Sequence, residues 1–340
     1  MIFLRDPMNI GNLSFERTKQ AVLSGTPLRG EALSRFVAGV ADARGHDAAD
    51  LLHQARTIRL ARLGRTVSLC AIVNAKSGRC SENCAFCAQS SHFGTSAPVH
   101  PFLETEEIAR AARTMRDLGA KRFGIVTSGL KPGGEDFARL LDAVRAVDAL
   151  GMEADASCGI LTPDELEQLK KAGLKAYHHN LETARSFFPA ICTTHDYEDD
   201  VRAVGHAVAA GLHVCSGGIF GLGESWEQRA ELAVTLGELG VQSVPVNFLH
   251  PIPGTPMASR PVLTPEEALK IVALLRFVLP DANIRICGGR QTVFGQTRGL
   301  EPLEAGANGL MIGDYLTTRG LDAQADRQGI LEAGWEISDD

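Results

Sequence analysis

Beyond residue 66, short apolar runs alternate with longer segments whose apolar residues recur at helical spacing. Start signals mark several of the longer segments, as at Thr162-Pro163 and Thr264-Pro265, where a capping residue precedes a first-turn proline. Repeated strand-to-helix units predict an α/β fold with a parallel sheet, and eight such units close a (β/α)8 barrel of the TIM type. The predicted strands are Ser68–Asn74, Lys121–Thr127, Glu153–Ser157, Lys175–Leu181, His213–Phe220, Ser243–Leu249, Asn283–Cys287 and Gly309–Gly313.

The rest of the chain is arranged around this barrel. Residues 1–65 are predicted to form an N-terminal helical extension that caps the outside or bottom of the barrel, which spans residues 66–316. Residues 317–340 are polar and aperiodic, and we expect a peripheral tail. A doubly wound open sheet is the alternative fold, but the unusual polar residues all lie at strand ends, where barrels carry their active sites.

Composition narrows the class of function. The 340 residues carry a net charge of −7 with the two signs interspersed, and the absence of a basic tract argues against binding to nucleic acid. No stretch approaches 18 apolar residues, and the N-terminus has no long hydrophobic region, so we expect a cytoplasmic protein without membrane spans. The 8 cysteines then indicate reduced thiols that serve a metal or catalysis.

Three cysteines follow the first predicted strand in a C-x3-C-x2-C run, Cys80, Cys84 and Cys87. Thiolates are the usual ligands of iron–sulfur clusters, and a closed four-iron cube takes four of them. Three thiolates therefore leave one iron open to an outside molecule, as in the pattern of radical S-adenosylmethionine (SAM) enzymes. The alternative is a structural zinc site, for which His92 is the candidate fourth ligand.

Polar residues lie at alternating positions at the end of the fourth predicted strand, His178, Asn180 and Glu182. Alternation places them on one face, which in a barrel strand can point into the interior. An amide beside a carboxylate suits a ribose diol and a urea or amide group. The alternative interpretation is a solvated strand end.

Three later strands carry further candidates. Ile219 lies in a glycine-rich turn after the fifth strand and is placed to pack against an adenine, and Asn247 is a polar residue at an apolar strand end. Arg285 and Cys287 are two residues apart and face the same way. A buried arginine needs an anion, which would be a sulfide-rich cluster or a carboxylate such as Asp155 or Glu153.

Five motifs in this order resemble the biotin synthase family over about residues 50–315. The resemblance implies a (β/α)8 barrel, usually dimeric, that cleaves SAM reductively to a 5′-deoxyadenosyl radical with electrons from a reductant such as flavodoxin or ferredoxin. It further implies dethiobiotin as substrate and sulfur from a second cluster. The motifs are CSENCAFCAQSSHF (Cys80–Phe93), YHHNLET (Tyr177–Thr183), VCSGGIFGLGE (Val214–Glu224), VPVNFLHPIPGTP (Val244–Pro256) and IRICGGR (Ile284–Arg290).

Residue roles follow from this resemblance motif by motif. Cys80, Cys84 and Cys87 would hold the SAM-binding [4Fe-4S] cluster, and Phe86 and Ile219 would lie near the adenine. Asn180 and Glu182 would bind the ribose, with Glu182 in place of the family's usual aspartate and Asn180 also touching substrate. Asn247 would hold the ureido ring.

The chain also departs from the family. The second cluster is usually [2Fe-2S], held by three cysteines and an arginine, and only Cys215 and Arg285 match; Gly124 and Asp155 occupy the other two positions. An arginine thought to pair with the SAM carboxylate falls on Asp200, and Arg202 lies half a turn further round that helix.

We therefore hypothesise a different auxiliary cluster, four-iron rather than [2Fe-2S], that carries an extra sulfide for donation and is held by Cys158, Cys192, Cys215 and Cys287 with Arg285. Strand parity makes Cys158 the least secure of these, and Cys70 is expected to be a core residue. The alternative for some of these thiols is ordinary burial. The competing functions are a radical SAM enzyme that inserts no sulfur and, less consistent with the strand-end residues, an electron carrier or zinc module.

Overall fold

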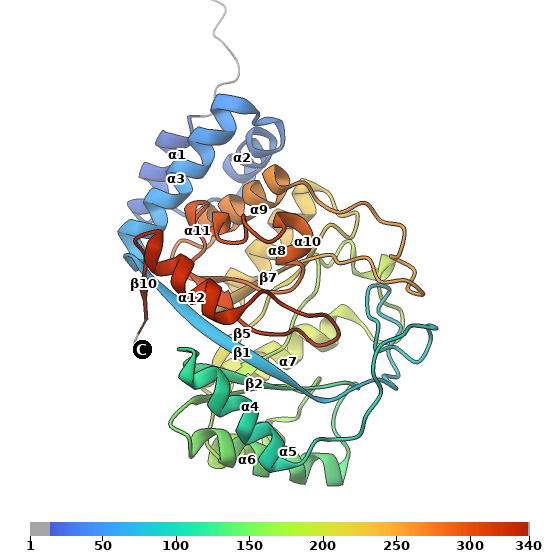
Figure 1. Ribbon diagram of the computed structural model, residues 1–340. Coiled ribbons are helices and arrows are strands. Elements are labelled where there is room, and N and C mark those ends of the chain that lie inside the picture. The colour runs from blue at the N-terminus through green and yellow to red at the C-terminus, as the bar shows by residue number, and fades with distance from the viewer. Residues whose placement is uncertain (1–13, 339–340) are drawn as a thin grey trace, which may run out of the picture.

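The structure, a computed structural model, describes residues 14–338 and is built around a closed barrel of parallel strands (Figure 1). Hydrogen bonding between β1 and β9 closes the barrel, which confirms the predicted (β/α)8 class. The strands are β1 (Thr66–Lys76), β2 (Arg122–Thr127), β3 (Glu153–Ser157), β4 (Leu174–His178), β5 (His213–Cys215), β6 (Gly218–Phe220), β7 (Ser243–Phe248), β8 (Asn283–Ile286) and β9 (Gly309–Met311).

The fifth barrel strand is divided into β5 and β6, whereas the sequence predicts one continuous strand. The backbone between them passes very close to β7: a Cβ atom on Gly217 would lie 2.0 Å from the carbonyl oxygen of Pro245. Only glycine permits this approach. The break lets the chain leave the sheet after Cys215 and pair with β7 again from Gly218 onward.

Helices cover the outside of the barrel (Figure 1). Side-chain caps mark the start of several of them: Thr162 accepts a hydrogen bond from the backbone of Glu165, and Ser225 caps the helix that begins at Trp226. None of the helices within residues 14–338 combines the length and apolar content needed to cross a bilayer. The helices around the barrel are α4 (Thr105–Asp117), α5 (Gly134–Asp148), α6 (Pro163–Lys171), α7 (Tyr197–Ala209), α8 (Trp226–Glu238), α9 (Pro265–Val278) and the shorter η1 (Phe188–Ala190), α10 (Arg290–Phe294) and α11 (Glu301–Glu304).

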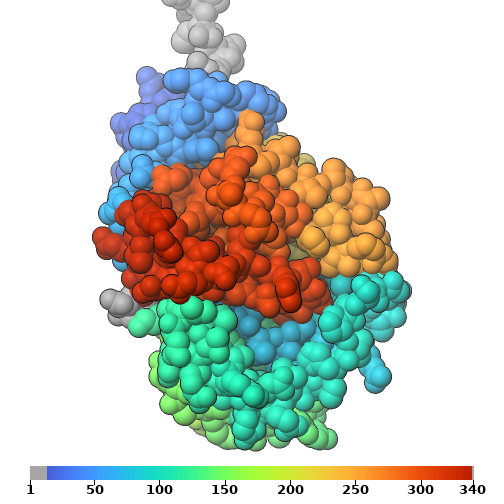
Figure 2. All heavy atoms as spheres, in the orientation of Figure 1, coloured from blue at the N-terminus to red at the C-terminus, as the bar shows by residue number. Residues whose placement is uncertain are grey.

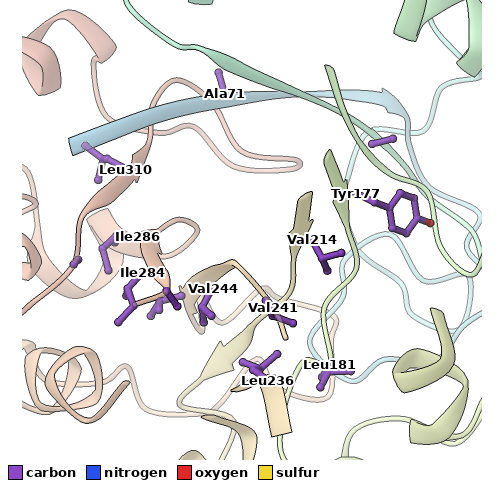
Figure 3. Close-up of a cluster of buried hydrophobic side chains, with 14 of the residues drawn as sticks. Ala71, Tyr177, Leu181, Val214, Leu236, Val241, Val244, Ile284, Ile286 and Leu310 are labelled. Carbon is purple, nitrogen blue, oxygen red and sulfur yellow. The ribbon is translucent and has the colours of Figure 1, made fainter. Parts of the chain in front are cut away.

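The main hydrophobic core lies between the strands and this layer of helices. Side chains alternate along a strand, so that Ala71, Val214 and Ile286, which belong to this core (Figure 3), have neighbours on the opposite face of their strands. Cys70 and Cys215 are such neighbours, and both line the interior cavity. The interior therefore holds polar and sulfur-containing residues beside apolar ones such as Ile72, and a site can form there.

Three leading helices form a second, smaller core at one end of the barrel, as predicted. They are α1 (Phe15–Leu23), α2 (Gly30–Asp42) and α3 (Gly45–Leu63), and they pack on α8 and α9 (Figure 1). The rings of Phe36 and Phe277 lie 4.7 Å apart at the centre of this contact. Residues 1–13 of the predicted extension lie outside the described part of the chain.

The C-terminal segment is not the peripheral tail that its sequence suggested. It forms α12 (Ala323–Glu332) and β10 (Glu336–Ile337), and β10 adds to the sheet beside the start of β1. Trp335 is only 3% exposed, and the guanidinium of Arg59 lies 3.9 Å from the centre of its ring. Trp335, together with the fully buried Ile330 of α12, therefore anchors a segment that is mostly polar.

Removal of Asp326 from this segment is expected to destabilise the protein strongly. Its carboxylate accepts a 2.8 Å hydrogen bond from Arg290, and both side chains are almost fully buried. Asp326→Ala leaves a buried guanidinium without its partner, which costs about 3–5 kcal/mol. The control is Asp322→Ala, which removes only the exposed N-cap of α12 and costs about 1 kcal/mol. Denaturant unfolding of both variants measures the difference, and equal midpoints would contradict the expectation.

Candidate active site

A cavity of about 440 Å³ opens among the loops at the C-terminal ends of the strands and continues into the barrel. Its mouth is bordered by the loop after β1 and the loop after β7, which meet on the surface (Figure 2). A Cβ atom on Gly254 would lie 2.2 Å from the carbonyl oxygen of Gly94, so the two loops are in backbone contact. Strand C-terminal ends are where barrels carry their active sites.

The three cysteines of the loop after β1 all line this cavity. Backbone hydrogen bonds hold the loop in shape: the Cys80 N–H donates to Gln89, and the Cys87 N–H donates to the carbonyl of Cys84. Burial raises the pKa of Cys87 to about 11, so a bound cation is needed to keep it as a thiolate. His92 hydrogen-bonds the Ser81 carbonyl and does not line the cavity, which argues against the zinc alternative.

Cys192 lies beside this loop and not beside the other auxiliary-cluster candidates, which corrects the hypothesis. Its Sγ is 3.9 Å from the Sγ of Cys84 and 3.4 Å from Nδ1 of His195. The segment after η1 packs on the cysteine loop, where the Ala85 N–H donates to the carbonyl of Ile191 at 2.8 Å. More than a hundred residues separate Cys84 from Cys192, so the local pattern carried no signal of this contact.

Asp200, which stands where the family has an arginine, lies between two histidines. His179 and His195 approach its carboxylate at 2.8 and 3.3 Å, and His195 also contacts Glu82 at 2.7 Å. Hydrogen bonds to Asp200 and Cys192 raise the pKa of His195 to about 11, which makes it a buried cation at the cavity wall. Arg202 instead pairs with Asp199 on the surface and does not line the cavity.

The predicted ribose pair lies just beyond β4 and faces the cavity. Asn180 donates to the Glu182 carboxylate at 3.2 Å. Glu182 has a positive φ of 61°, and its carbonyl accepts the N–H of Ile219 at 2.8 Å. Burial, with the charge of Asp200, raises the pKa of Glu182 to about 8. These two residues are held by loop contacts and not by the strand itself, which ends at His178.

Phe86, Ile219 and Asn247 line the same cavity, as the resemblance implied. Asn247 joins two strand ends: its amide donates to the carbonyl of Gly218 at 3.3 Å, and its Oδ1 accepts the N–H of Gly288 at 2.9 Å. Its amide is thereby fixed at the cavity wall.

Deeper in the barrel a second set of thiols comes together. Cys70 and Cys287 pack with Met311, and these three line the cavity along with Cys215 and Arg285. Burial lowers the pKa of the Arg285 guanidinium, but the neighbouring cysteines raise it, and the net result is a pKa above the ordinary value. Thiols on β1, on β5 and after β8 thus share the barrel interior with the guanidinium of Arg285.

Arg285 forms no ion pair with a carboxylate within residues 14–338. Its guanidinium donates to the carbonyl and hydroxyl of Ser68 at 3.2 and 3.0 Å. Glu153, one of the two predicted partners, is instead paired with Arg122 at 2.6 Å. Asp155, the other, lines the cavity, and burial raises its pKa to about 6 while the charges of Arg122 and Arg285 oppose that shift. The positive charge of Arg285 therefore remains available to an anion in the cavity.

Two cysteine assignments change as a result. Cys158 is buried outside the cavity among the core side chains, with its Sγ 3.9 Å from the hydroxyl of Tyr177. Cys70, expected to be a core residue, faces the interior and contacts the cluster of Cys287 and Met311. The run Ser68–Asn74 is apolar on both faces, so its alternation could not show which side Cys70 faces.

Both sets of residues fit iron–sulfur clusters by the chemistry of their donors. Cys80, Cys84 and Cys87 offer three thiols from one loop at the cavity, which suits a cube with one open iron. The deeper set offers three thiols and a guanidinium. Thiols this deeply buried are neutral on their own, as the raised pKa of Cys215, about 12, illustrates.

Comparisons with known proteins agree with this arrangement. Residues 75–236 match the family model "Radical SAM superfamily", and residues 245–336 match "Biotin and Thiamin Synthesis associated domain". A biotin synthase of Nitratidesulfovibrio vulgaris (strain Hildenborough) is 51% identical over 288 residues, which is 84% of this chain and 79% of that protein. A biotin synthase of Geobacter sulfurreducens is 50% identical over 300 residues, with 86% and 89% covered.

Solved structures show the same fold at low sequence identity. Methylornithine synthase superposes with a TM-score of 0.82 at 19% identity, over 94% of this chain and 97% of that one. The [FeFe]-hydrogenase maturase of Carboxydothermus hydrogenoformans gives 0.77 at 19% identity, with 95% and 79% covered. Together with the identities of about half over most of its length, the three-cysteine loop and the barrel place this chain in the biotin synthase family of the radical SAM superfamily.

Proposed function

We propose that the protein is a biotin synthase, which inserts sulfur into dethiobiotin by radical SAM chemistry. The observation that carries this proposal is a single cavity with a three-thiol loop at its mouth, a second thiol set in its depth, and Asn180, Glu182 and Asn247 also on its wall. A substrate held in that cavity has both sets of thiols within the same enclosed space.

The bound groups would supply a 5′-deoxyadenosyl radical from SAM at the first cluster and a sulfur atom at the second. The side chains of the protein would bind and orient SAM and the substrate. Glu182 and Asn180 are placed to hold the ribose hydroxyls, and Phe86 and Ile219 offer apolar contact to the adenine. Asp200, at the position of the missing arginine, is paired with His179 and His195, and both ring nitrogens of His195 are already engaged by carboxylates.

The auxiliary cluster of the proposal is four-iron, with Cys70, Cys215 and Cys287 as its thiolates and Arg285 as its neighbouring cation. Support comes from the position of these residues in one part of the cavity and from the absence of cysteine at Gly124 and Asp155. A side chain at Gly124 would meet Ile72, since a Cβ there would lie 3.0 Å from Cγ2 of Ile72. With glycine at this position, β2 offers no thiolate for a [2Fe-2S] site of the usual family kind.

Anaerobic turnover with dethiobiotin, SAM and a reductant tests the function, with biotin as the readout. About eight irons per chain after reconstitution would match two four-iron clusters. About four irons, with SAM cleaved and no biotin formed, would favour the competing radical SAM enzyme without sulfur insertion. A flavodoxin- or ferredoxin-type electron donor, a homodimer and a cytoplasmic location stay predictions.

Asn247→Ala is expected to weaken dethiobiotin binding and to leave slow, uncoupled SAM cleavage. The loss of one buried hydrogen bond to a urea costs roughly 1–3 kcal/mol, or about five- to hundredfold in affinity. Isothermal titration with dethiobiotin measures the change. Asn283→Ala, on the neighbouring strand but not at the cavity, is the control and should bind as the unmodified protein does. An unchanged dissociation constant for Asn247→Ala would contradict the ureido role.

A further inference from the structure

One carboxylate in the depth of the cavity has no use in the arrangement described so far. Asp155 lies on β3, where it pairs with Gly124 of β2 and with Ala176 of β4, and its side chain lines the cavity. The residue is only 7% exposed. Its Oδ1 atom has no hydrogen-bond partner within residues 14–338.

The neighbouring cations do not satisfy this carboxylate directly. Arg122 is engaged by Glu153 at 2.6 Å, and Arg285 donates to Ser68. A buried carboxylate oxygen without a hydrogen-bond partner is unfavourable, so Oδ1 of Asp155 is free to bind a group in the cavity.

The thiols nearby are one ligand short of a complete set for a four-iron cluster. Cys70, Cys215 and Cys287 offer three ligands, whereas a closed four-iron cube takes four. The charge of Asp155 is close enough to affect the Cys215 thiol, whose pKa it raises together with burial. Carboxylate oxygens bind iron, as in the 2-His-1-carboxylate sites of other iron proteins.

We propose that Asp155 is the fourth ligand of the auxiliary cluster and binds through oxygen the one iron that has no thiolate. The inference deepens the proposed function, on which it rests. An oxygen ligand binds this iron more weakly than a thiolate does. That iron is thereby the one at which a ligand such as the donated sulfide can be exchanged.

The test uses the full-length chain with the loop thiols removed (Cys80→Ala, Cys84→Ala, Cys87→Ala), so that all bound cluster iron belongs to the auxiliary site. After anaerobic reconstitution with ⁵⁷Fe and sulfide, Mössbauer spectra are expected to show one iron distinct from the other three. Asp155→Asn, of the same size but neutral, should change the parameters of this distinct iron and speed its release to a chelator about tenfold or more. Asp155→Cys should retain about four irons with thiolate-like parameters throughout.

The control is Ser157→Ala, which changes a cavity-lining residue two positions along the same strand and should leave the spectrum and the release rate unchanged. Unaltered spectra and release in Asp155→Asn would overturn the Asp155 assignment. If no auxiliary cluster binds at these thiols, the proposed function itself fails, and Cys215→Ala in the same background would hold as much iron as its parent. That result would also overturn the Asp155 assignment.

Discussion

Cys84→Ala is expected to reduce both SAM cleavage and biotin formation to the background of a protein without the cluster. Cys84 is the middle cysteine of the loop and lines the cavity. With only Cys80 and Cys87 left, the loop cannot hold a cube that keeps one iron open to SAM. The measurement is release of 5′-deoxyadenosine after anaerobic reconstitution, together with the iron content.

Cys192→Ala is the matched control for this variant. It removes a thiol whose sulfur lies 3.9 Å from that of Cys84 but leaves the three loop thiols in place. We expect it to keep the loop's iron and to cleave SAM. Undiminished 5′-deoxyadenosine release from Cys84→Ala, or loss of the loop's iron from Cys192→Ala alone, would show that the ligand assignment is wrong.

The second large effect is expected at the deeper thiols. Cys215→Ala or Cys287→Ala should remove about four irons per chain and stop biotin formation, while SAM cleavage continues. The two functions should separate because the proposed ligands of the first cluster all lie in the loop after β1, whereas these cysteines are on β5 and after β8. Cys70→Ala should behave in the same way, which distinguishes the thiol set seen in the structure from the one inferred from sequence.

Cys158→Ala serves as the control for the deeper set, since its thiol is buried outside the cavity. It should retain both the iron content and biotin formation if the chain folds. Full iron content and continued biotin formation in Cys215→Ala and Cys287→Ala would instead favour a radical SAM enzyme with a single cluster.

Local patterns in the sequence were sufficient for the barrel and for the first candidate cluster site. Strand and helix periodicity is encoded over a few residues, so the eight strands were located correctly, apart from the break between β5 and β6. The three-cysteine loop is likewise a short-range feature. Asn180, Glu182 and Asn247 were found because strand ends of a parallel barrel meet at one face.

Only the tertiary structure decided which thiols share a site. Pairing of β1 with β9 closes the barrel and places Cys70 next to Met311 on the adjacent strand. Packing of the segment after η1 on the cysteine loop places Cys192 beside Cys84. Trp335, likewise, anchors a polar C-terminal segment. The sequence by itself determined the strands, the loop and the family, because those depend on neighbouring residues; the grouping of Cys70, Cys215 and Cys287 depends on strand register around a closed barrel, which no local pattern contains.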